Sequence, residues 1–430
     1  MANGKAALTA SWGDVWLLGG VRTPFADYNG PLAAVSPTDL GIKAAREVFK
    51  RSGLPPQDVG AVITGSMAQA SFDTYCLPRH IGLYSGVPIE VPAHMVQRVC
   101  GTGLEVLMQA ADFVTHKDVG LTLCVGAESM SRNPIASYTM RGFRMGAVDF
   151  KDFLWEALRD PAADASMGDT AENLARQYQI TRPQVDAYAA RSFERALAAQ
   201  QSGFLAGEIA PVKSEAFERE GFKPRAFKLK GGKELGSDTH IRPSPIEVLA
   251  KIPPAFGGVQ TGGNSSAIVD GAAAALVASC DYAKRPGKLS LARIVAGATV
   301  GVPPEIMGIG PVPAIKAVLE RAGHKLADID RFEINEAFGA QVMACARELG
   351  IDEAKLNVNG GAIAIGHPLG ATGVRLAITL ARELKRARLR LGIAAACIGG
   401  GQGIALLIEN PDLSSPRKNR PWTSKDTLPS

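Results

Sequence analysis

The sequence predicts an α/β fold made of two similar halves. Short apolar runs alternate with amphipathic helical patterns along most of the chain, as in proteins whose sheets are covered by helices. One helix–turn–strand unit recurs at an offset of about 270 residues, which indicates an internal duplication. Between about residues 131 and 256 the pattern becomes irregular, which indicates a large excursion from the first half.

Seven apolar runs have the length and composition of buried strands. Between them, apolar residues follow helical spacing at 104–111 and again at 376–384. The predicted strands are 15–18, 61–64 and 121–126 in the first half, and 292–300, 331–334, 391–397 and 403–408 in the second.

The duplication is seen most clearly where a helix ends and a strand begins. Arg51-Ser-Gly-Leu-Pro-Pro-Gln-Asp58 matches Arg321-Ala-Gly-His-Lys-Leu-Ala-Asp328, and a buried run follows each copy. Two unrelated helix–turn–strand units could resemble each other by chance. The parallel order of further glycine-rich turns, each opening an amphipathic helix, favours duplication.

The domain organisation follows from these patterns. We expect an N-terminal half over residues 13–285, with a loop domain at about 131–256 inserted in it, and a C-terminal half over residues 286–410. Residues 411–430 are rich in Pro, Ser and basic side chains, so we expect a mobile extension. The stretch 222–233 holds five basic residues and no acidic one, and a solvated face is a slightly better interpretation than a phosphate site.

Composition excludes several classes of protein. Hydrophobic residues make up 46% of the chain and charged residues 21%, as in ordinary globular proteins. The net charge of +5 suits a small anionic ligand and does not require nucleic acid. Six cysteines without a C-x-x-C pair argue against zinc sites and disulfide frameworks. No secretory signal or membrane span is expected, so a cytoplasmic location is predicted.

Cys100 is the strongest candidate for a nucleophile. It precedes Gly101-Thr-Gly103 and an amphipathic helix, where the helix dipole and free amides favour a thiolate and can hold an oxyanion. A small core residue is the alternative for any cysteine. The surrounding glycines make the nucleophile the better interpretation here.

Three further residues complete a candidate constellation. His367, flanked by Gly366 and Pro368, could remove the Cys100 proton, although isolated histidines are often structural. Asn335 follows a strand and could bind an oxyanion or position a water, whereas an Asx turn or a helix cap is its common alternative role.

Cys397 ends a predicted strand before a second glycine-rich turn. The turn, Gly399-Gly400-Gly401-Gln-Gly403, is followed by another strand pattern and not by a helix, which argues against a dinucleotide-binding loop. We therefore interpret Cys397 as a second thiol that works as an acid and a base.

These segments together resemble the thiolase family, the acetyl-CoA acetyltransferases and 3-ketoacyl-CoA thiolases. The resemblance covers roughly residues 15–410 and includes several motifs in the same order. They are Val21-Arg-Thr-Pro-Phe, Met167-Gly-Asp-Thr-Ala-Glu-Asn, Gly263-Asn-Ser-Ser-Ala-Ile-Val-Asp-Gly and Met307-Gly-Ile-Gly-Pro-Val-Pro-Ala.

The resemblance implies a fold and a partner. Two βαβαβαββ halves would pack face to face into a five-layered α-β-α-β-α core, with the loop domain inserted in the first half. Acyl-CoA and CoA would be the substrates or products, with no further cofactor and no metal. The protein would be a homodimer or homotetramer.

The resemblance also implies a reaction and its residues. Cys100, activated by His367, would take an acyl group from one acyl-CoA, and Cys397 would deprotonate a second acetyl-CoA for a reversible Claisen condensation. One oxyanion hole would come from His367 Nε2 and a water held by Asn335, and the other from the N–H groups of Cys100 and Gly399. The residues expected to contact the acyl group or CoA are Met167, Arg242, Ser266, Met307 and Phe338.

The sequence departs from the family pattern in places. Many short-chain members carry His where this chain has Ser166, which puts strict acetyl or acetoacetyl specificity in doubt. Gly19-Gly20 stands where the family has Ser-Ala. Three alternatives stay open. One is a ketoacyl-synthase-like condensing enzyme, which needs no second cysteine, and another is a sterol-carrier-type thiolase, which would tend to have His in place of Asn335. The third is a non-catalytic thiolase-like scaffold, in which Cys100 or His367 would have been lost.

Overall fold

One ten-stranded sheet organises the molecule. The structure, a computed structural model, describes residues 7–68, 73–137, 148–229, 231–285 and 290–413. Along the sheet the strands follow the order β14-β15-β16-β13-β1-β12-β5-β3-β4, with β2 paired to β12. These strands are β1 (Ala7–Arg22), β2 (Ala26–Asp27), β3 (Ala61–Gly65), β4 (Ala93–Val96), β5 (Leu121–Glu128), β12 (Val269–Ser279), β13 (Ala292–Gly301), β14 (Arg331–Ile334), β15 (Leu391–Ile398) and β16 (Gln402–Glu409).

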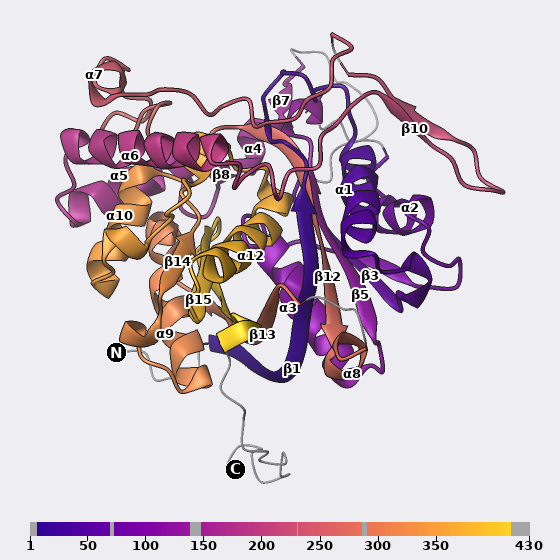
Figure 1. The fold of residues 1–430 in the computed structure, drawn as a ribbon. Coiled ribbons are helices and arrows are strands. Elements are labelled where there is room, and N and C mark those ends of the chain that lie inside the picture. Colours follow the sequence, from indigo (N-terminus) through magenta and orange to yellow (C-terminus); the bar gives the residue numbers. More distant parts are fainter. Residues whose placement is uncertain (1–6, 69–72, 138–147, 230, 286–289, 414–430) are drawn as a thin grey trace.

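Strand β1 joins the two halves. Its first part pairs antiparallel with β13 and its second part, from Val15 onward, pairs antiparallel with β12. The first-half strands therefore lie on one side of β1 and the second-half strands on the other. Figure 1 shows the two groups of strands facing each other across helices in the centre of the molecule.

Helices form three layers around these strands (Figure 1). Helices α1 and α2 cover the outer face of the first half, α3 and α12 pack together between the halves, and α9 covers the outer face of the second half. The predicted layered α/β fold is thus confirmed. The helices are α1 (Pro37–Ser52), α2 (Leu77–Tyr84), α3 (Thr102–His116), α4 (Phe153–Ala157), α5 (Met167–Gln177), α6 (Arg182–Gln201), α7 (Ile246–Leu249), α8 (Cys280–Ala283), α9 (Pro311–Ala322), α10 (Gly339–Leu349), α11 (Ala362–Ile365) and α12 (Leu369–Arg386).

The core follows the alternation of side chains along each strand. In β5, Leu123 and Val125 join the apolar cluster under α1 and α2, whereas Cys124 joins the larger cluster around α3 and α12. Both faces of the strand are therefore buried, as expected for strands that read as continuous apolar runs.

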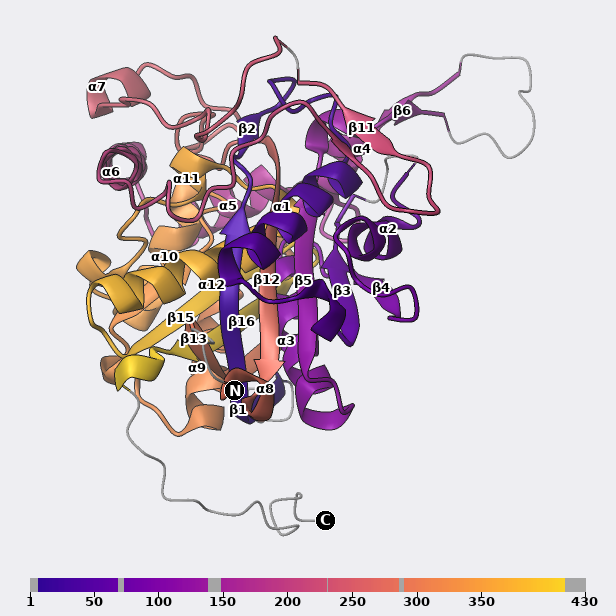
Figure 2. The ribbon, with the colours of Figure 1, turned by 45° about the vertical axis from the view of Figure 1, so that its right-hand side comes forward.

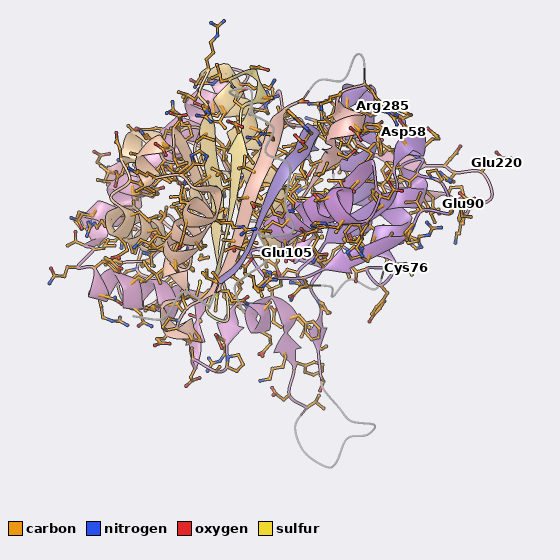
Figure 3. All side chains as sticks on the ribbon, turned by 90° about the horizontal axis from the view of Figure 1, so that it is seen from below. Asp58, Cys76, Glu90, Glu105, Glu220 and Arg285 are labelled. Atoms are coloured by element: carbon orange, nitrogen blue, oxygen red, sulfur yellow. The ribbon has the colours of Figure 1, made fainter. Side chains whose placement is uncertain are left out.

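The duplicated unit is present in the structure. Helix α1 ends at Gly53, which has φ +64°, and helix α9 ends at Gly323, which has φ +71°. After each glycine a short 3-10 turn contains the predicted aspartate, Asp58 or Asp328, and the strand β3 or β14 follows. Figure 3 shows Asp58 beside Arg285, its ion-pair partner at 3.6 Å.

All seven predicted strands are present, but the sequence pattern missed the other three strands of the sheet: β12, β4 and the two-residue β2. Strand β12 lies next to β1 and is the longest of the first half after it. Its sequence is dominated by alanine, which has little strand propensity, so the apolar run gave no strand signal. Strand β4 is short, only partly buried, and lies at the edge of the sheet.

The excursion between the halves lies across the upper end of the molecule in Figures 1 and 2. Helices α5 and α6 lie in it, and the rest of its described residues are largely irregular with three short strand pairs: β6 (Ile135–Ala136) with β7 (Lys151–Asp152), β8 (Arg159–Asp160) with β9 (Ala165–Ser166), and β10 (Glu215–Phe217) with β11 (Arg225–Phe227). The fully buried Arg22 of β1 anchors it by ion pairs with Glu208 and Asp238, both at 2.6 Å.

The chain beyond β16 is described only as far as residue 413, where 411–413 form a 3-10 turn. The extension predicted to be mobile otherwise lies outside the described residues. Across the described ranges, no helix combines the length and hydrophobicity that crossing a bilayer requires.

Candidate active site

Cys100 lies in a tight turn between β4 and α3. The preceding residue, Val99, has φ +45°, in the left-handed region that β-branched side chains disfavour. The Thr102 hydroxyl holds the turn, because it accepts a hydrogen bond from the N–H of Arg98 at 2.8 Å and donates to the carbonyl of Val99 at 2.6 Å. Cys100 therefore stands just before a helix, as the glycine pattern predicts.

The Cys100 turn packs against the end of β15. A Cβ atom at Gly101 would lie 2.5 Å from the Cδ1 atom of Ile398, so a larger residue would force the Ile398 side chain to move. The N–H groups of Gly399 and of Cys100 itself favour the charged form of the Cys100 sulfur and lower the pKa of its thiol. The two amides predicted to form an oxyanion hole therefore act on the same sulfur atom.

Burial changes the expected ionisation of Cys100. The pKa of the Cys100 thiol is raised to about 11, because removal from water, with a smaller contribution from the Glu128 carboxylate, outweighs the lowering by the Gly399 and Cys100 amides. The amides act as expected, but the loss of hydration outweighs them. The resting group is a thiol, and the expectation of a favoured thiolate is wrong for the unliganded site.

His367 follows a glycine and begins the approach to α12. A side chain at Gly366, which has φ +107°, would collide with Val269. The His367 ring is held from one side, where Nδ1 lies 2.6 Å from the Thr372 hydroxyl, which in turn donates to the carbonyl of Pro368 at 3.0 Å. A hydroxyl that donates to that carbonyl accepts from Nδ1–H, so this network leaves the lone pair on Nε2.

The His367 imidazole is neutral at rest. Burial, together with the nearby positive charge of Arg375, lowers its pKa to about 3. A neutral imidazole with a lone pair on Nε2 is the form that can accept a proton from a thiol.

Asn335 reaches the other ring nitrogen of His367. It follows strand β14, and its backbone N–H donates to the carbonyl of Ala395 at 2.9 Å. Its side-chain Nδ2 donates to His367 Nε2 at 3.3 Å, and its Oδ1 is buried without a hydrogen bond among the described residues. The side chain is therefore directed at His367 and does not form an Asx turn or a helix cap.

Cys397 lies at the end of β15, deeper than Cys100. Its side chain is fully buried in a small apolar cluster with Met167, Met307 and Phe338. Burial raises the pKa of this thiol well above its usual value, and Cys100 raises it further. The strand β16 follows the glycine turn directly, which confirms that no dinucleotide-binding helix starts there.

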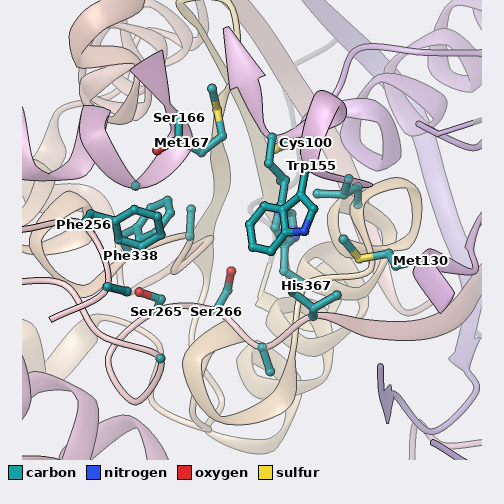
Figure 4. A pocket seen from close by; sticks show the side chains of 18 of the residues that line it. Cys100, Met130, Trp155, Ser166, Met167, Phe256, Ser265, Ser266, Phe338 and His367 are labelled. Atoms are coloured by element: carbon teal, nitrogen blue, oxygen red, sulfur yellow. The ribbon is translucent and has the colours of Figure 1, made fainter. Parts of the chain in front are cut away.

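An apolar cavity of about 230 Å³ brings most of the candidate residues together. Cys100 and His367 line it (Figure 4), together with Met167, Ser266, Met307 and Phe338. Asn335, Cys397 and Gly399 stand behind this lining: Asn335 contacts His367, Cys397 contacts the same apolar side chains, and the Gly399 N–H acts on the Cys100 sulfur.

Arg242 is the candidate that lies apart from the cavity lining. It is exposed, its Nη1 donates to the carbonyl of His240 at 3.1 Å, and its guanidinium lies 5.5 Å from the centre of the Phe193 ring. In the basic stretch 222–233, Arg225 forms ion pairs with Asp39 and Asp73, so it is already neutralised.

Several residues of the site were not found from the sequence. Trp155 of α4 and Phe256 line the cavity, and the Phe256 ring meets Phe338 edge to face at 6.0 Å. The buried Glu128 carboxylate accepts from the N–H groups of Met67 and Gly370, so it ties the two halves together beside Cys100. Glu128 lies just after a predicted strand, and that position could have identified it as a candidate site residue. No pattern in the irregular excursion distinguishes Trp155 in this way.

Comparisons with known proteins give the family. Residues 15–281 match the model of the thiolase N-terminal domain, and residues 288–410 match that of the thiolase C-terminal domain. The mouse mitochondrial 3-ketoacyl-CoA thiolase is 41% identical over 405 residues, which cover 92% of this chain and 98% of that protein. A beta-ketothiolase of Cupriavidus necator is 40% identical over 401 residues, covering 92% and 99%.

A comparison with solved structures gives the same family. A crystal structure of human mitochondrial 3-ketoacyl-CoA thiolase in complex with CoA superposes with a TM-score of 0.87 at 40% identity, covering 92% of this chain and 98% of that one. The fold and these matches define an acyltransferase. The chain belongs to the thiolase family. No comparison supports the ketoacyl-synthase-like or the non-catalytic alternative.

Proposed function

We propose that the protein catalyses the reversible condensation of acetyl-CoA with a second acyl-CoA to a 3-ketoacyl-CoA, and the reverse thiolysis, through an acyl-Cys100 intermediate. Family membership supports this reaction. The observation that carries the residue assignment is the convergence of the Cys100 thiol and the His367 ring at one apolar cavity.

In the first half-reaction, the Cys100 thiol passes its proton to His367 Nε2 and attacks the thioester carbonyl. The carbonyl oxygen becomes an oxyanion, and the N–H groups of Cys100 and Gly399 donate to it. When the C–S bond to CoA breaks, the CoA sulfur needs a proton. Cys397 supplies it, because its raised pKa means that the thiol and not the thiolate is present at rest.

In the second half-reaction, the Cys397 thiolate removes a proton from the α-carbon of acetyl-CoA. The enolate oxygen accepts hydrogen bonds from protonated His367 Nε2 and from a water held by Asn335. The enolate carbon attacks the acyl group, the bond to Cys100 breaks, and the Cys100 sulfur recovers its proton from His367. Each residue ends in its starting form, so the reaction runs equally in the thiolytic direction.

Substrate contacts follow from the cavity. Met167, Met307 and Phe338 would border the acyl group, and Ser266 would contact the pantetheine arm of CoA. Arg242 would reach the nucleotide, since its exposed guanidinium is held by His240 and Phe193 at the surface. CoA is a substrate or product here, and the reaction needs no further cofactor.

Assembly and location are also proposals. Residues 13–285 and 286–410 would form the two halves, with 131–256 as the inserted loop domain. The chain would form a homodimer or homotetramer, which the exposed apolar side chains of Ile135 and Phe150, 68% and 62% accessible beside the β6–β7 pair, support. A cytoplasmic location is proposed, and fractionation against mitochondrial markers tests it, because several relatives are mitochondrial.

The experiment separates the roles of the two thiols. Incubation with acetyl-CoA followed by peptide mass spectrometry should place the acyl group on Cys100. Cys397→Ser should still become acylated but should exchange the methyl protons of acetyl-CoA with solvent far more slowly than the wild type. Acylation confined to Cys397 would reverse the assignment, and unchanged exchange in Cys397→Ser would remove its role as the base.

A further inference from the structure

A second, solvent-open groove lies far from the active-site cavity. It has a volume of about 350 Å³ and is bounded by the second part of β1, the end of α1, Gly207 and the last turns of α12. His367 precedes α12, whereas Arg382 and Lys385 near its other end line the groove. Arg382 lies thirteen positions after Leu369 along the helix, which corresponds to about 20 Å.

The charged side chains that line this groove are all basic. They are Arg51, Arg382 and Lys385, and no aspartate or glutamate is among its described lining residues. An adjoining hollow, which shares Arg382 and Lys385, adds Arg386. The groove is therefore a local concentration of positive charge on a chain whose net charge is only +5.

Most of these cations have partners, and Arg382 is the exception. Arg51 donates to Glu47 and to two backbone carbonyls, including that of Gly207 at 3.0 Å. Lys385 and Arg386 lie in the last turn of α12, where they complement the helix dipole, and they form ion pairs with Asp412 and Glu383. The charges of Arg51, Lys385 and Arg386 are therefore already paired within the protein, without any ligand.

Arg382 has no carboxylate partner among the described residues. Its one hydrogen bond is a long contact of 3.4 Å from Nη2 to the carbonyl of Phe204, and its Nε is buried without a partner. The guanidinium lies against Gly207 and 5.5 Å from the centre of the Phe204 ring. Burial lowers its pKa; the Glu208 carboxylate, which is already hydrogen-bonded to Arg22, opposes this only in part, and the positive charge of Arg51 lowers the pKa further.

The backbone of β1 adds a donor on the same side. The N–H of Arg22 donates to Glu208 and its carbonyl accepts from Ala210, so both point away from β12. Because strand residues alternate, the N–H of Gly20 points the same way, toward the groove that Gly20 lines.

We propose that this groove is a binding site for a phosphate-bearing small anion, separate from the CoA site, with Arg382 as its principal ligand and Lys385 as a second. A guanidinium presents a planar pair of donors that matches phosphate oxygens, and an unpaired, half-buried one gains most from such a partner. The exposed Lys385–Asp412 pair is weak enough to open for an anion.

The test uses inorganic pyrophosphate as the probe and the full chain as the sample. Calorimetric titration and thermal melting are run at constant ionic strength, with sodium chloride replaced by pyrophosphate, and inorganic phosphate and ADP are parallel arms. The wild type should bind pyrophosphate saturably. Arg382→Met, which keeps the aliphatic stem but removes the charge, should weaken binding about tenfold or more. Lys385→Gln should weaken it a few fold.

Two control variants locate the site. Lys316→Ala removes a comparable exposed ion pair on α9, with Glu348, and should bind like the wild type. Arg242→Ala should also retain pyrophosphate binding, because that residue belongs to the proposed CoA site. ADP binding that survives Arg242→Ala but not Arg382→Met would identify a nucleotide as the source of the phosphate, and pyrophosphate or phosphate binding alone would identify a free anion.

Three results would overturn the proposal. They are no saturable binding by the wild type, equal affinity in the wild type and in both Arg382→Met and Lys385→Gln, and loss of binding in Arg242→Ala with retention in Arg382→Met. Thiolysis activity verifies the folding of Arg382→Met, Lys385→Gln and Lys316→Ala, since none of these residues lines the active-site cavity, and the thermal melt verifies the folding of Arg242→Ala.

Discussion

At the residue scale, the protonation states of Cys100 and His367 decide how the nucleophile is activated. Burial raises the pKa of Cys100 to about 11 and lowers that of His367 to about 3. Below the first value the thiol is protonated, and above the second the imidazole is neutral. The pair therefore rests as thiol and neutral base, and the proton moves only when the substrate carbonyl is attacked.

This resting state predicts a flat pH profile for acylation. Between about pH 5 and about pH 9 neither group changes its protonation, so the acylation rate constant should vary little. Stopped-flow release of CoA from acetyl-CoA by Cys397→Ser isolates this step. A rate that rises tenfold per pH unit across the neutral range would show that a pre-formed thiolate is the reactive species.

The contact of Thr372 with His367 Nδ1 gives a second prediction. Thr372→Val keeps the shape of the side chain but leaves a buried Nδ1–H without an acceptor, at a cost of about 1–3 kcal/mol. We expect acylation to slow roughly ten- to a hundredfold with little change in KM. Thr372→Ser, which keeps the hydroxyl, should restore most of the rate. Equal rates in the Val and Ser variants would show that Thr372 does not position the ring.

The sequence could predict the chemistry of these residues but not their contacts. Cys100, His367 and Cys397 were identifiable because glycine turns mark places where backbones approach closely. Thr372 lies in the same segment as His367, yet only the fold shows that its hydroxyl meets the ring. The position of Trp155 depends on the path of an irregular segment, for which no periodic pattern exists.

At the scale of elements, the contact between α3 and α12 positions both candidate catalytic segments. The two helices cross where Gly103 meets Gly373, and a Cβ atom at Gly103 would lie 2.7 Å from the backbone nitrogen of Gly373. Backbone atoms on both sides have no room to move. Because each helix begins a few residues after Cys100 or His367, this crossing sets how those residues face each other.

Gly103→Ala should therefore destabilise the protein and slow acylation together. Overpacking against rigid backbone costs about 1–3 kcal/mol, which should appear as a lower Tm. Gly301→Ala is the matched control, since a Cβ atom there meets nothing within 4 Å, and its stability should change by less than about 0.5 kcal/mol. A Gly103→Ala variant with unchanged Tm and rate would mean that the crossing relaxes easily.

The elements themselves were largely predictable, because most strands are long apolar runs and most helices are amphipathic. The exception, β12, shows the limit: an alanine-rich segment is buried on both faces, so neither propensity nor alternation distinguishes it from a helix. Its place beside β1 is a long-range pairing that local sequence does not encode.

At the scale of the whole molecule, the cavity exists only because three parts of the chain meet. Cys100 comes from the first half, His367 from the second, and Ser166 and Phe256 from the segments between them. The length of acyl chain that fits is thus set largely by the inserted region. Ser166 begins α5, where its hydroxyl and Asp169 form a capping box, and it lines the cavity with a small side chain.

We expect activity on acetoacetyl-CoA and on somewhat longer 3-ketoacyl chains. Each methylene placed in an apolar pocket contributes about 1 kcal/mol or a little more, so kcat/KM should change gradually along a series from C4 to C10. Ser166→His should fill the space and lower the C6-to-C4 ratio of kcat/KM about tenfold. Ser166→Ala, which loses the same helix cap but adds no bulk, should keep the wild-type ratio at a stability cost of about 1 kcal/mol.

These two variants distinguish the effect of free space in the cavity from the effect of losing the cap of α5. If both lower the C6-to-C4 ratio equally, the cap and not the free space controls chain length. If the wild type itself loses about a thousandfold between C4 and C6, more than one or two methylenes give, the side chains around Ser166 already close the pocket. If the pocket has free space beside Ser166, only Ser166→His should lower the C6-to-C4 ratio of kcat/KM, and the wild type and Ser166→Ala should share the higher ratio.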